Sequence, residues 1–401
     1  MASGARPIGR LLFVQYGNYA EAWSRMNDGA AETYRDQFSS VAFVDGLADG
    51  REVTTVAFSS AAHDITLRPG LRSIGLAGAP PGRGVLDGLI DELTPDGIVC
   101  RTPHPPLIAA CAARGIRTLP NFADIFEAKT LRRRARLWLL GRAIRRLTAP
   151  CVSNHSLNAS RSLVTAVGIP AERVVPWDWQ PLVPRSEAKT GLADPARPTL
   201  FYAGHLSEAK GVGDCIEAVA LLHRDGIDAT LSIAGGGDPG ALRKRADALG
   251  ITQAVRLLGT LSQGEVREGM ASHDIVLVPS RHDYAEGLPN TIYEALASRS
   301  ALVISDHPAF AGRLADGQDC VVFRAADPSS LADALRRLIE TPALYRCLSE
   351  NAPRALGGLS VGMQWTDLVS RFVDDPDNRT GWVAPNSLAT LTNGSQAGSS
   401  G

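Results

Sequence analysis

The sequence predicts an α/β protein made of two doubly wound domains, and three observations lead to this prediction. The chain has 401 residues, which is more than one hydrophobic core usually serves. Short apolar runs alternate with longer amphipathic stretches along almost the whole chain, as in βα units that feed a mostly parallel sheet. A proline-rich stretch from 176 to 198 interrupts this alternation, which then restarts. We therefore expect two Rossmann-like domains joined by a linker.

The apolar runs give the expected strands and the domain limits. In the first half we expect strands at 10–15, 52–57, 71–75, 97–101, 116–119, 149–153 and 173–176. In the second half we expect them at 199–204, 229–234, 254–258, 274–279, 301–305 and 320–323. The first domain is expected over 1–185 and the second over 195–360, with the boundary between 185 and 197.

Two helices and a tail are expected at the C-terminal end. Asp327 and Pro328 have the pattern of an N-cap followed by proline in the first helical turn. In the range 362–375, the residues Trp365, Leu368, Val369 and Phe372 repeat at helical spacing and form an apolar stripe that must pack against something. The tail, 378–401, is rich in Gly, Ser, Asn and Thr, so we expect it to be disordered.

The composition excludes several classes of protein. The chain is 44% hydrophobic and 21% charged with 39 glycines, which is typical of a soluble globular protein. Its formal net charge of -1 gives no overall attraction to nucleic acid, so no nucleic-acid partner is expected. The six cysteines are scattered without C-x-x-C or zinc-site spacing and are expected to be buried thiols in a reducing cytosol. No apolar run near the N-terminus is long enough for a secretory signal or a membrane span, so we expect a cytoplasmic protein with at most peripheral membrane contact.

The strongest candidate site follows the expected strand 274–279. It contains Glu286, Gly287, Leu288, Asn290, Thr291 and Glu294. A carboxylate beyond a strand end can accept hydrogen bonds from two vicinal hydroxyls, and a glycine lets backbone N–H groups approach a ligand. A helix that begins near Asn290 would direct its positive end to the same place, where a phosphate could bind. Two carboxylates with a phosphate site between them suit a nucleotide sugar.

Two further turns of the second domain carry candidate residues. After the strand 199–204, Lys210 is placed to balance a diphosphate, and His205 lies in the same turn. Gly235 and Gly236 form a turn at the end of the next strand, where the backbone can approach a phosphate or ribose. Such a glycine turn is equally the pattern of an ordinary tight turn.

In the first domain the loops after the strands are the candidate acceptor side. Gly17 lies in the loop after the first strand, and Arg101 and His104 lie in the loop after 97–101. Loops at the carboxyl ends of parallel strands face one crevice, so we expect either Arg101 or His104 to line the acceptor side. Asn121 and Asp124, after the next strand, are further candidates.

Residues 131–146 contain seven arginines among 16 residues, interleaved with leucine and tryptophan. Such a segment is typical of a basic amphipathic helix that lies on anionic lipid. It is equally typical of a packed helix whose basic face is solvated, and both interpretations stay open at this stage.

The block from Glu286 to Glu294 resembles the glutamate-x7-glutamate motif of retaining glycosyltransferases of the GT-B fold, in particular the large family four, or glycosyltransferase group 1. The resemblance is strong from about 199 to 355 and weaker before 180. It implies two Rossmann-like domains facing across a cleft, with the last helix, 362–375, crossing back to the first domain. It further implies that Glu286 binds the hydroxyls of the donor sugar, that Gly287 and Leu288 offer backbone donors, and that Glu294 binds the ribose.

The same resemblance assigns roles to the other turns of the second domain. Lys210 matches the diphosphate-binding lysine of the family, whereas His205 stands where the family usually has arginine, whose bidentate fork histidine cannot make. Leu258 falls in the stretch whose backbone contacts the base. In the first domain, the family's usual histidine position in the loop after 97–101 falls on Arg101 rather than His104.

The function implied is transfer of a sugar, with retention, from a nucleotide-diphosphate sugar to a hydroxyl acceptor, in the biosynthesis of a cell-surface polysaccharide or glycoconjugate. No metal and no cofactor besides the donor is expected, because no Asp-x-Asp pair accompanies the motif. A lipid-linked glycan is one candidate acceptor, which would place the protein at the inner face of the cell membrane. The alternatives are a sugar-nucleotide epimerase or phosphorylase of the same architecture and a GT-B protein that binds nucleotide sugar without catalysis.

Overall fold

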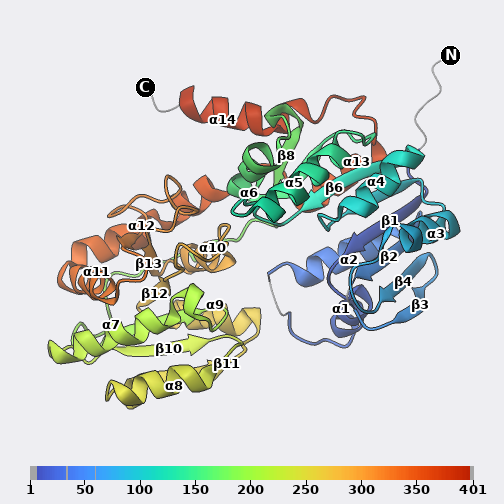
Figure 1. Cartoon of the computed structure of the whole chain (residues 1–401). Helices are drawn as coiled ribbons and strands as arrows, with labels where there is room; N and C mark the ends of the chain where they lie inside the picture. Colours follow the sequence, from blue (N-terminus) through green and yellow to red (C-terminus); the bar gives the residue numbers. More distant parts are fainter. Residues whose placement is uncertain (1–6, 33–34, 59, 398–401) are drawn as a thin grey trace. The chain divides into compact units, whose positions relative to one another are not determined.

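The structure is a computed structural model that describes residues 7–32, 35–58 and 60–397 (Figure 1). The chain divides into two compact units. Unit 1 comprises residues 1–32, 36–180 and 361–401, and unit 2 comprises 33–35 and 181–360. The first division falls at 180/181, ahead of the 185–197 boundary that the prolines suggested, because the segment after 181 packs on unit 2.

Unit 1 is built on an eight-stranded sheet in the order β3-β4-β2-β1-β5-β6-β7-β8. All neighbouring strands are parallel except β3 and β4, which are antiparallel. The strands are β1 (Arg10–Gln15), β2 (Glu52–Phe58), β3 (His63–Arg68), β4 (Leu71–Leu76), β5 (Gly97–Cys100), β6 (Arg117–Phe122), β7 (Val152–His155) and β8 (Val174–Trp177). The parallel strands agree with the expected ones within a few residues, whereas β3 was not expected.

Helices connect these strands as βα units. They are α1 (Tyr19–Asn27), α2 (Gln37–Leu47), α3 (Arg83–Leu93), α4 (Pro105–Arg114), α5 (Leu131–Ile144), α6 (Ser156–Ser162), η1 (Leu163–Val167) and η2 (Ala171–Arg173). After the return of the chain at 361, unit 1 continues with α13 (Trp365–Asp374), η5 (Ala384–Asn386) and α14 (Leu388–Ala397).

Both faces of the unit 1 sheet are buried, which explains why its central strands are continuous apolar runs. In β1, Leu11 and Phe13 belong to one hydrophobic cluster, whereas Leu12 and Val14 belong to another. Successive side chains of a strand point to opposite faces, so an unbroken apolar run requires cover on both sides. Helices α3, α4 and α5 cover the face of Leu12 and Val14, and α1, α2 and α13 cover the other face.

The C-terminal segment belongs to unit 1 and is ordered well beyond 378. The apolar stripe of α13 is buried in the same cluster as Phe13, and Trp365 is only 1% exposed. Further along, Trp382 and Val383 join this cluster, and Leu388 of α14 packs in the cluster on the other face. The prediction of a disordered tail is therefore wrong for 378–392, because a few buried apolar side chains hold a segment of otherwise polar composition; residues 398–401 lie outside the described part of the chain.

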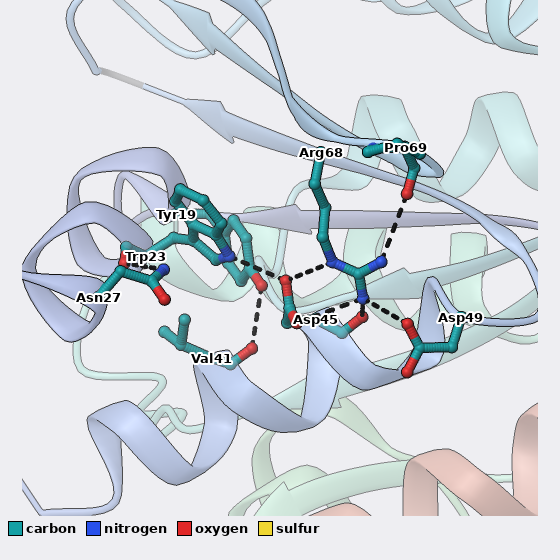
Figure 2. A network of polar contacts seen from close by, with 8 residues as sticks. All are labelled: Tyr19, Trp23, Asn27, Val41, Asp45, Asp49, Arg68 and Pro69. Atoms are coloured by element: carbon teal, nitrogen blue, oxygen red, sulfur yellow. Dashed lines mark hydrogen bonds and ion pairs between the residues drawn. The ribbon is translucent and has the colours of Figure 1, made fainter.

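A network of polar contacts holds the unexpected strand β3 to the helices beside it (Figure 2). Arg68, the last residue of β3, donates from Nε to Asp45 Oδ1 of α2 at 2.9 Å, and its Nη2 lies 2.9 Å from Asp49 Oδ1. Trp23 of α1 donates to the same Oδ1 of Asp45 at 2.8 Å. Burial alone would raise the pKa of Asp45, but the hydrogen bonds from Arg68 and Trp23 outweigh burial and lower it.

Unit 2 is built on a six-stranded parallel sheet in the order β11-β10-β9-β12-β13-β14. Its strands are β9 (Thr199–Ala203), β10 (Thr230–Ala234), β11 (Val255–Gly259), β12 (Ile275–Val278), β13 (Ala301–Ser305) and β14 (Val321–Phe323). Its helices are η3 (Glu208–Lys210), α7 (Val212–Arg224), α8 (Pro239–Ala248), η4 (Thr252–Ala254), α9 (Gln263–Ser272), α10 (Asn290–Ala297), α11 (Pro328–Glu340) and α12 (Pro342–Leu359). Every strand agrees with an expected one, and both faces of the sheet are again buried.

The part of the proline-rich stretch that follows Gln180, residues 181–198, has no helix or strand and is bound to unit 2. Arg185 N donates to Ala297 O at 2.8 Å, and Lys189 N donates to Ser349 Oγ at 2.8 Å. The Lys189 ammonium is largely buried, where it donates to Met270 O at 3.1 Å and Ser300 Oγ at 3.1 Å. Burial lowers the pKa of Lys189 to about 8.

Two further sequence expectations have structural counterparts. Of the six cysteines, none is in a disulfide and only Cys347 is not buried. Among the described residues, no helix combines the length and the apolar composition needed to cross a bilayer.

The packing of α13 gives a stability prediction. Replacing Trp365 by alanine removes a side chain that packs edge-on against Phe43 at 5.5 Å and donates from Nε1 to Asn121 Oδ1 at 2.8 Å. Emptying such a site should lower the free energy of unfolding by about 3–5 kcal/mol. Trp138→Ala is the matched control, because Trp138 is 58% exposed and its loss should change stability by less than about 0.5 kcal/mol. Urea unfolding followed by circular dichroism measures both; equal effects of the two substitutions would contradict the packing described.

Candidate donor-binding site

The candidate residues of unit 2 lie on loops that leave one edge of its sheet. Strand β9 lies between β10 and β12, and all three are parallel, so the loops that follow them leave at the same carboxyl edge. These loops are 204–211 after β9, 235–237 after β10 and 279–289 after β12. The parallel arrangement of these strands therefore brings Lys210, the glycine turn and Glu286 to one edge of the sheet.

Lys210 and Glu286 form a direct ion pair. Lys210 Nζ lies 2.5 Å from Glu286 Oε2, and Ser280 Oγ donates to the same oxygen at 2.8 Å. The ammonium also lies 4.4 Å from the centre of the Tyr284 ring. Both side chains are largely buried, with Lys210 15% and Glu286 8% exposed. Among the described residues no hydrogen bond reaches Glu286 Oε1, so this oxygen can accept hydrogen bonds from a ligand.

Arg281 holds the loop that carries Lys210. Its guanidinium donates from Nε to Asp214 Oδ2 at 2.9 Å and lies 2.8 Å from Glu208 Oε1. Its backbone N–H donates to Ala209 O at 2.9 Å. Asp214 is 1% exposed, and the hydrogen bond with this buried carboxylate raises the pKa of Arg281. One arginine therefore joins the loop after β12 to the loop after β9.

The same two loops touch through their backbones at Gly211. Gly211 has φ +72°, and a Cβ at this position would lie 2.0 Å from the carbonyl oxygen of Pro279. Only glycine allows both this left-handed conformation and this approach. The close approach of the chain after β12 therefore requires glycine directly after Lys210.

The glycine turn after β10 packs against the loop after β9 in a similar way. A Cβ on Gly235, which has φ +147°, would lie 1.8 Å from Gly204 O. Leu206 N donates to Gly236 O at 2.8 Å. Gly236 itself is exposed, so its backbone is open to a ligand. The turn thus has both a structural reason for its glycines and an accessible backbone.

Helix α10 begins at Asn290, as expected, and no side chain caps its N-terminus. Pro289 occupies the N-cap position, and Thr291 Oγ1 donates to Ala203 O at 3.2 Å. Leu288 is 5% exposed and Gly287 is partly exposed. The positive end of the helix therefore remains available to an anion at the strand ends.

Glu294 lies one turn further along α10 and is 6% exposed. Its Oε1 accepts a hydrogen bond from Gln263 Nε2 at 3.4 Å. Burial raises the pKa of Glu294, and the bond from Gln263 opposes this effect. By contrast, Leu258 on β11 is 41% exposed, which is unusual for leucine at the end of a strand.

His205 is exposed in the turn after β9. Its carbonyl oxygen accepts a hydrogen bond from Tyr202 Oη at 2.8 Å, which fixes the backbone of the turn. This hydrogen bond therefore fixes the main chain of His205. The role of its imidazole in the site stays a prediction.

The candidates of unit 1 also follow strand ends. Gly17 O accepts from Gln15 Nε2 at 2.9 Å, and Arg101 Nη1 donates to Gln15 Oε1 at 3.4 Å. The Arg101 guanidinium lies 4.9 Å from the centre of the Trp365 ring, whose indole N–H donates to Asn121. The structure thus joins Arg101 and Asn121 through Trp365 within one cluster.

His104 has a different surrounding from Arg101. It is the N-cap of α4, and its Nδ1 accepts from Leu107 N at 3.4 Å. Burial and the charge of Arg136 lower the pKa of His104. Burial also raises the pKa of Asp124, the remaining acceptor-side candidate.

Sequence reasoning missed three residues of the unit 2 site: Ser280, Tyr284 and Arg281. Ser280 and Arg281 come within three residues of the end of β12, so their place at the carboxyl end of a strand was a usable signal. The pairing of Arg281 with Asp214 joins positions 67 residues apart and has no such signal.

Residues 185–355 match the family model described as glycosyl transferases group 1. Unit 2 is a glycosyl transferases group 1 domain. Among the sequence relatives, an alpha-D-kanosaminyltransferase of Streptomyces kanamyceticus is 33% identical over 163 residues, 40% of this chain and 41% of the relative. A phosphatidyl-myo-inositol mannosyltransferase of Mycobacterium leprae is 30% identical over 147 residues, 36% of this chain and 38% of the relative. These alignments span less than half of each curated relative.

Solved structures extend the likeness to both units. Anabaena HepE in complex with UDP superposes with a TM-score of 0.63 at 14% identity, covering 96% of this chain and 100% of that chain. WaaG, a glycosyltransferase involved in lipopolysaccharide biosynthesis, gives 0.61 at 15% identity, covering 91% and 99%. The chain has the two-domain GT-B fold, as the sequence predicted.

The contact at Gly211 gives a second prediction. Gly211→Ala adds a strained φ and a clash with Pro279, so the free energy of unfolding should fall by about 2–4 kcal/mol. Gly226→Ala is the matched control: its φ is +81°, but a Cβ there would meet no atom within 4 Å, so only the cost of about 1–2 kcal/mol for the conformation remains. Thermal or urea unfolding compares the two; a smaller loss for Gly211→Ala than for Gly226→Ala would contradict the close approach.

Proposed function

We propose that the chain is a retaining, metal-independent glycosyltransferase that moves a sugar from a nucleotide-diphosphate sugar to a hydroxyl acceptor. One observation carries the proposal: the Lys210–Glu286 pair lies at the same sheet edge as the uncapped N-terminus of α10 in a group 1 domain. Positive charge for a diphosphate and an acceptor oxygen for sugar hydroxyls are then side by side.

Each end of the donor has a candidate partner. Glu286 Oε1 accepts the sugar hydroxyls, while Lys210 and Ser280 fix the carboxylate through Oε2. Lys210, the N-terminus of α10 and the backbone of Gly236 bind the diphosphate and stabilise the charge that develops on it as the glycosidic bond breaks. Glu294 binds the ribose hydroxyls, and the backbone near Leu258 contacts the base.

The proposal assigns no protein nucleophile. The departing phosphate oxygen accepts the proton of the incoming acceptor hydroxyl on the same face of the sugar, which gives retention. Lys210 and the positive end of α10 supply the charge that a divalent metal would otherwise supply. His205 and either Arg101 or His104 are the remaining candidates near the reacting groups.

The names of the similar proteins support a proposal for the classes of donor and acceptor. The UDP in the HepE structure supports a nucleotide-diphosphate donor. The mannosyltransferase of Mycobacterium leprae is named for a phosphatidylinositol acceptor, and WaaG for a lipopolysaccharide pathway. We therefore propose a cell-surface glycoconjugate product and contact with the inner face of the membrane through 131–146.

The first test is the substitution Glu286→Gln. It removes the charge that holds Lys210 and weakens the bonds to the sugar hydroxyls, so transfer should fall by about 100-fold or more with the fold intact. Transfer is measured as release of nucleoside diphosphate with acceptor present. Glu268→Gln is the matched control, because Glu268 is exposed on α9 outside the site.

Full activity of Glu286→Gln would contradict the assignment. The same assay without acceptor separates an enzyme from a protein that only binds nucleotide sugar. An enzyme should hydrolyse the donor slowly to nucleoside diphosphate, whereas a binder should release none.

A pH dependence follows from the burial of Glu294. Because burial raises its pKa, Glu294 should become protonated, and lose its strongest bonds to ribose, at a pH above the ordinary glutamate value of about 4.3. The affinity for the best of UDP, GDP and ADP, chosen by thermal shift, should therefore weaken as the pH falls from about 7 toward that value. Glu294→Gln should show a shallower pH dependence by calorimetry. Titration of the nucleotide itself is common to both proteins, so identical slopes would refute the role of Glu294.

A further inference from the structure

Unit 1 has an open cavity of about 650 Å³ on the outer side of helices α3, α4 and α5, away from the polar residues at its strand ends other than His104. Its volume is in the range of about 300–1,000 Å³ that is usual for small-molecule sites. Its walls are formed by Arg83 of α3 and by residues of α4 and α5, with His104 directly before α4 and Arg146 just after α5.

The wall of the cavity divides into two kinds of surface. Prolines and alanines of α4, with Ala143 and Leu139 of α5, form an apolar surface without long side chains. Arginines make up nearly all of the charged lining. A site of this composition fits a ligand that is apolar along most of its length and anionic at one end.

The lining arginines on and just after α5 lack the acidic partner that the other lining arginine has. Arg83 pairs with Asp87 at 2.9 Å. In the part of the chain that the structure describes, none of Arg136, Arg142 and Arg146 has a carboxylate within 4 Å. Asp124 offsets part of the Arg136 charge from a longer distance. Three guanidinium groups without an ion pair at one cavity, in a chain of net charge -1, still favour an anionic ligand there.

The outer surface of α5 is also unusually apolar. Leu131 is 83% exposed, Trp138 58% and Leu139 50%, and Arg142 lies over the Trp138 ring at 5.7 Å. Arg136 and Arg142 lie on the same helix as these exposed apolar side chains, as in helices that lie at the surface of an anionic membrane.

We propose that this cavity binds a phosphorylated lipid, with the hydrocarbon chain against Pro106, Ala109 and Ala112 and the phosphate on Arg136, Arg142 and Arg146. The assignment of this lipid as the carrier of the sugar acceptor rests on the proposed function. His104 supports that link, because it is both an acceptor-side candidate at the end of β5 and part of the cavity wall.

Calorimetric titration of the full chain with decyl phosphate, below its critical micelle concentration, tests the site directly. Saturable binding of one molecule is expected, with inorganic phosphate and the uncharged decyl maltoside binding about ten-fold or more weakly. Two variants should each weaken binding of decyl phosphate by about ten-fold: Arg136→Gln with Arg142→Gln, which removes charge, and Ala109→Phe, which fills the cavity.

The matched control is Arg132→Gln with Arg133→Gln, which removes the same charge from exposed positions of α5 outside the cavity. Unchanged binding in this control supports the site, whereas an equal loss would show general adsorption to a basic surface and overturn the proposal. Equal binding of inorganic phosphate, or unchanged binding in Ala109→Phe with an unchanged unfolding temperature, would also overturn it.

This experiment needs neither donor nor turnover. A protein that does not bind decyl phosphate but hydrolyses the donor would therefore contradict only the cavity proposal. A protein that binds decyl phosphate but shows no transfer or donor hydrolysis would contradict only the proposed transferase function.

Discussion

The close approach of two backbones in unit 2 decides where the Lys210 ammonium lies. Gly211 is in contact with the carbonyl of Pro279, and Arg281 ties the same loops through side-chain and main-chain bonds. Lys210 is the residue before Gly211, and Glu286 follows Arg281 in the loop after β12. Their pairing thus follows from the parallel arrangement of β9 and β12 and from a glycine that no other residue can replace.

The two units differ in how their charges are balanced. In unit 2 the Lys210 ammonium is paired with Glu286, so one carboxylate fixes where this charge lies. In unit 1 the arginines of α5 have no carboxylate partners within the described chain. The first arrangement favours a specific geometry, and the second favours capture of anions over a longer range.

Features of the fold that follow from the burial of local apolar runs could be predicted from the sequence. Features that depend on partners distant in the sequence could not. The parallel strands were predictable because both faces are buried and their apolar runs are continuous. Strand β3 was not, because its residues are mostly exposed at the sheet edge and leave no apolar signal. Helix α14 was missed because Leu388 stands in a polar, glycine-containing segment that tertiary contacts order. Lys210 and Glu286 were identified by spacing and resemblance, whereas the Arg281–Asp214 pair requires the folded chain.

The fastening of the proline-rich segment has a consequence for any reaction that uses both units. Since Leu182 already packs on a hydrophobic cluster of unit 2 and Arg185 is hydrogen-bonded to Ala297, the tether after Gln180 is very short. The chain passes back from unit 2 to unit 1 between residues 360 and 361, which is a second covalent link without a linker segment. The two short covalent links therefore keep each unit at a high effective concentration with respect to the other.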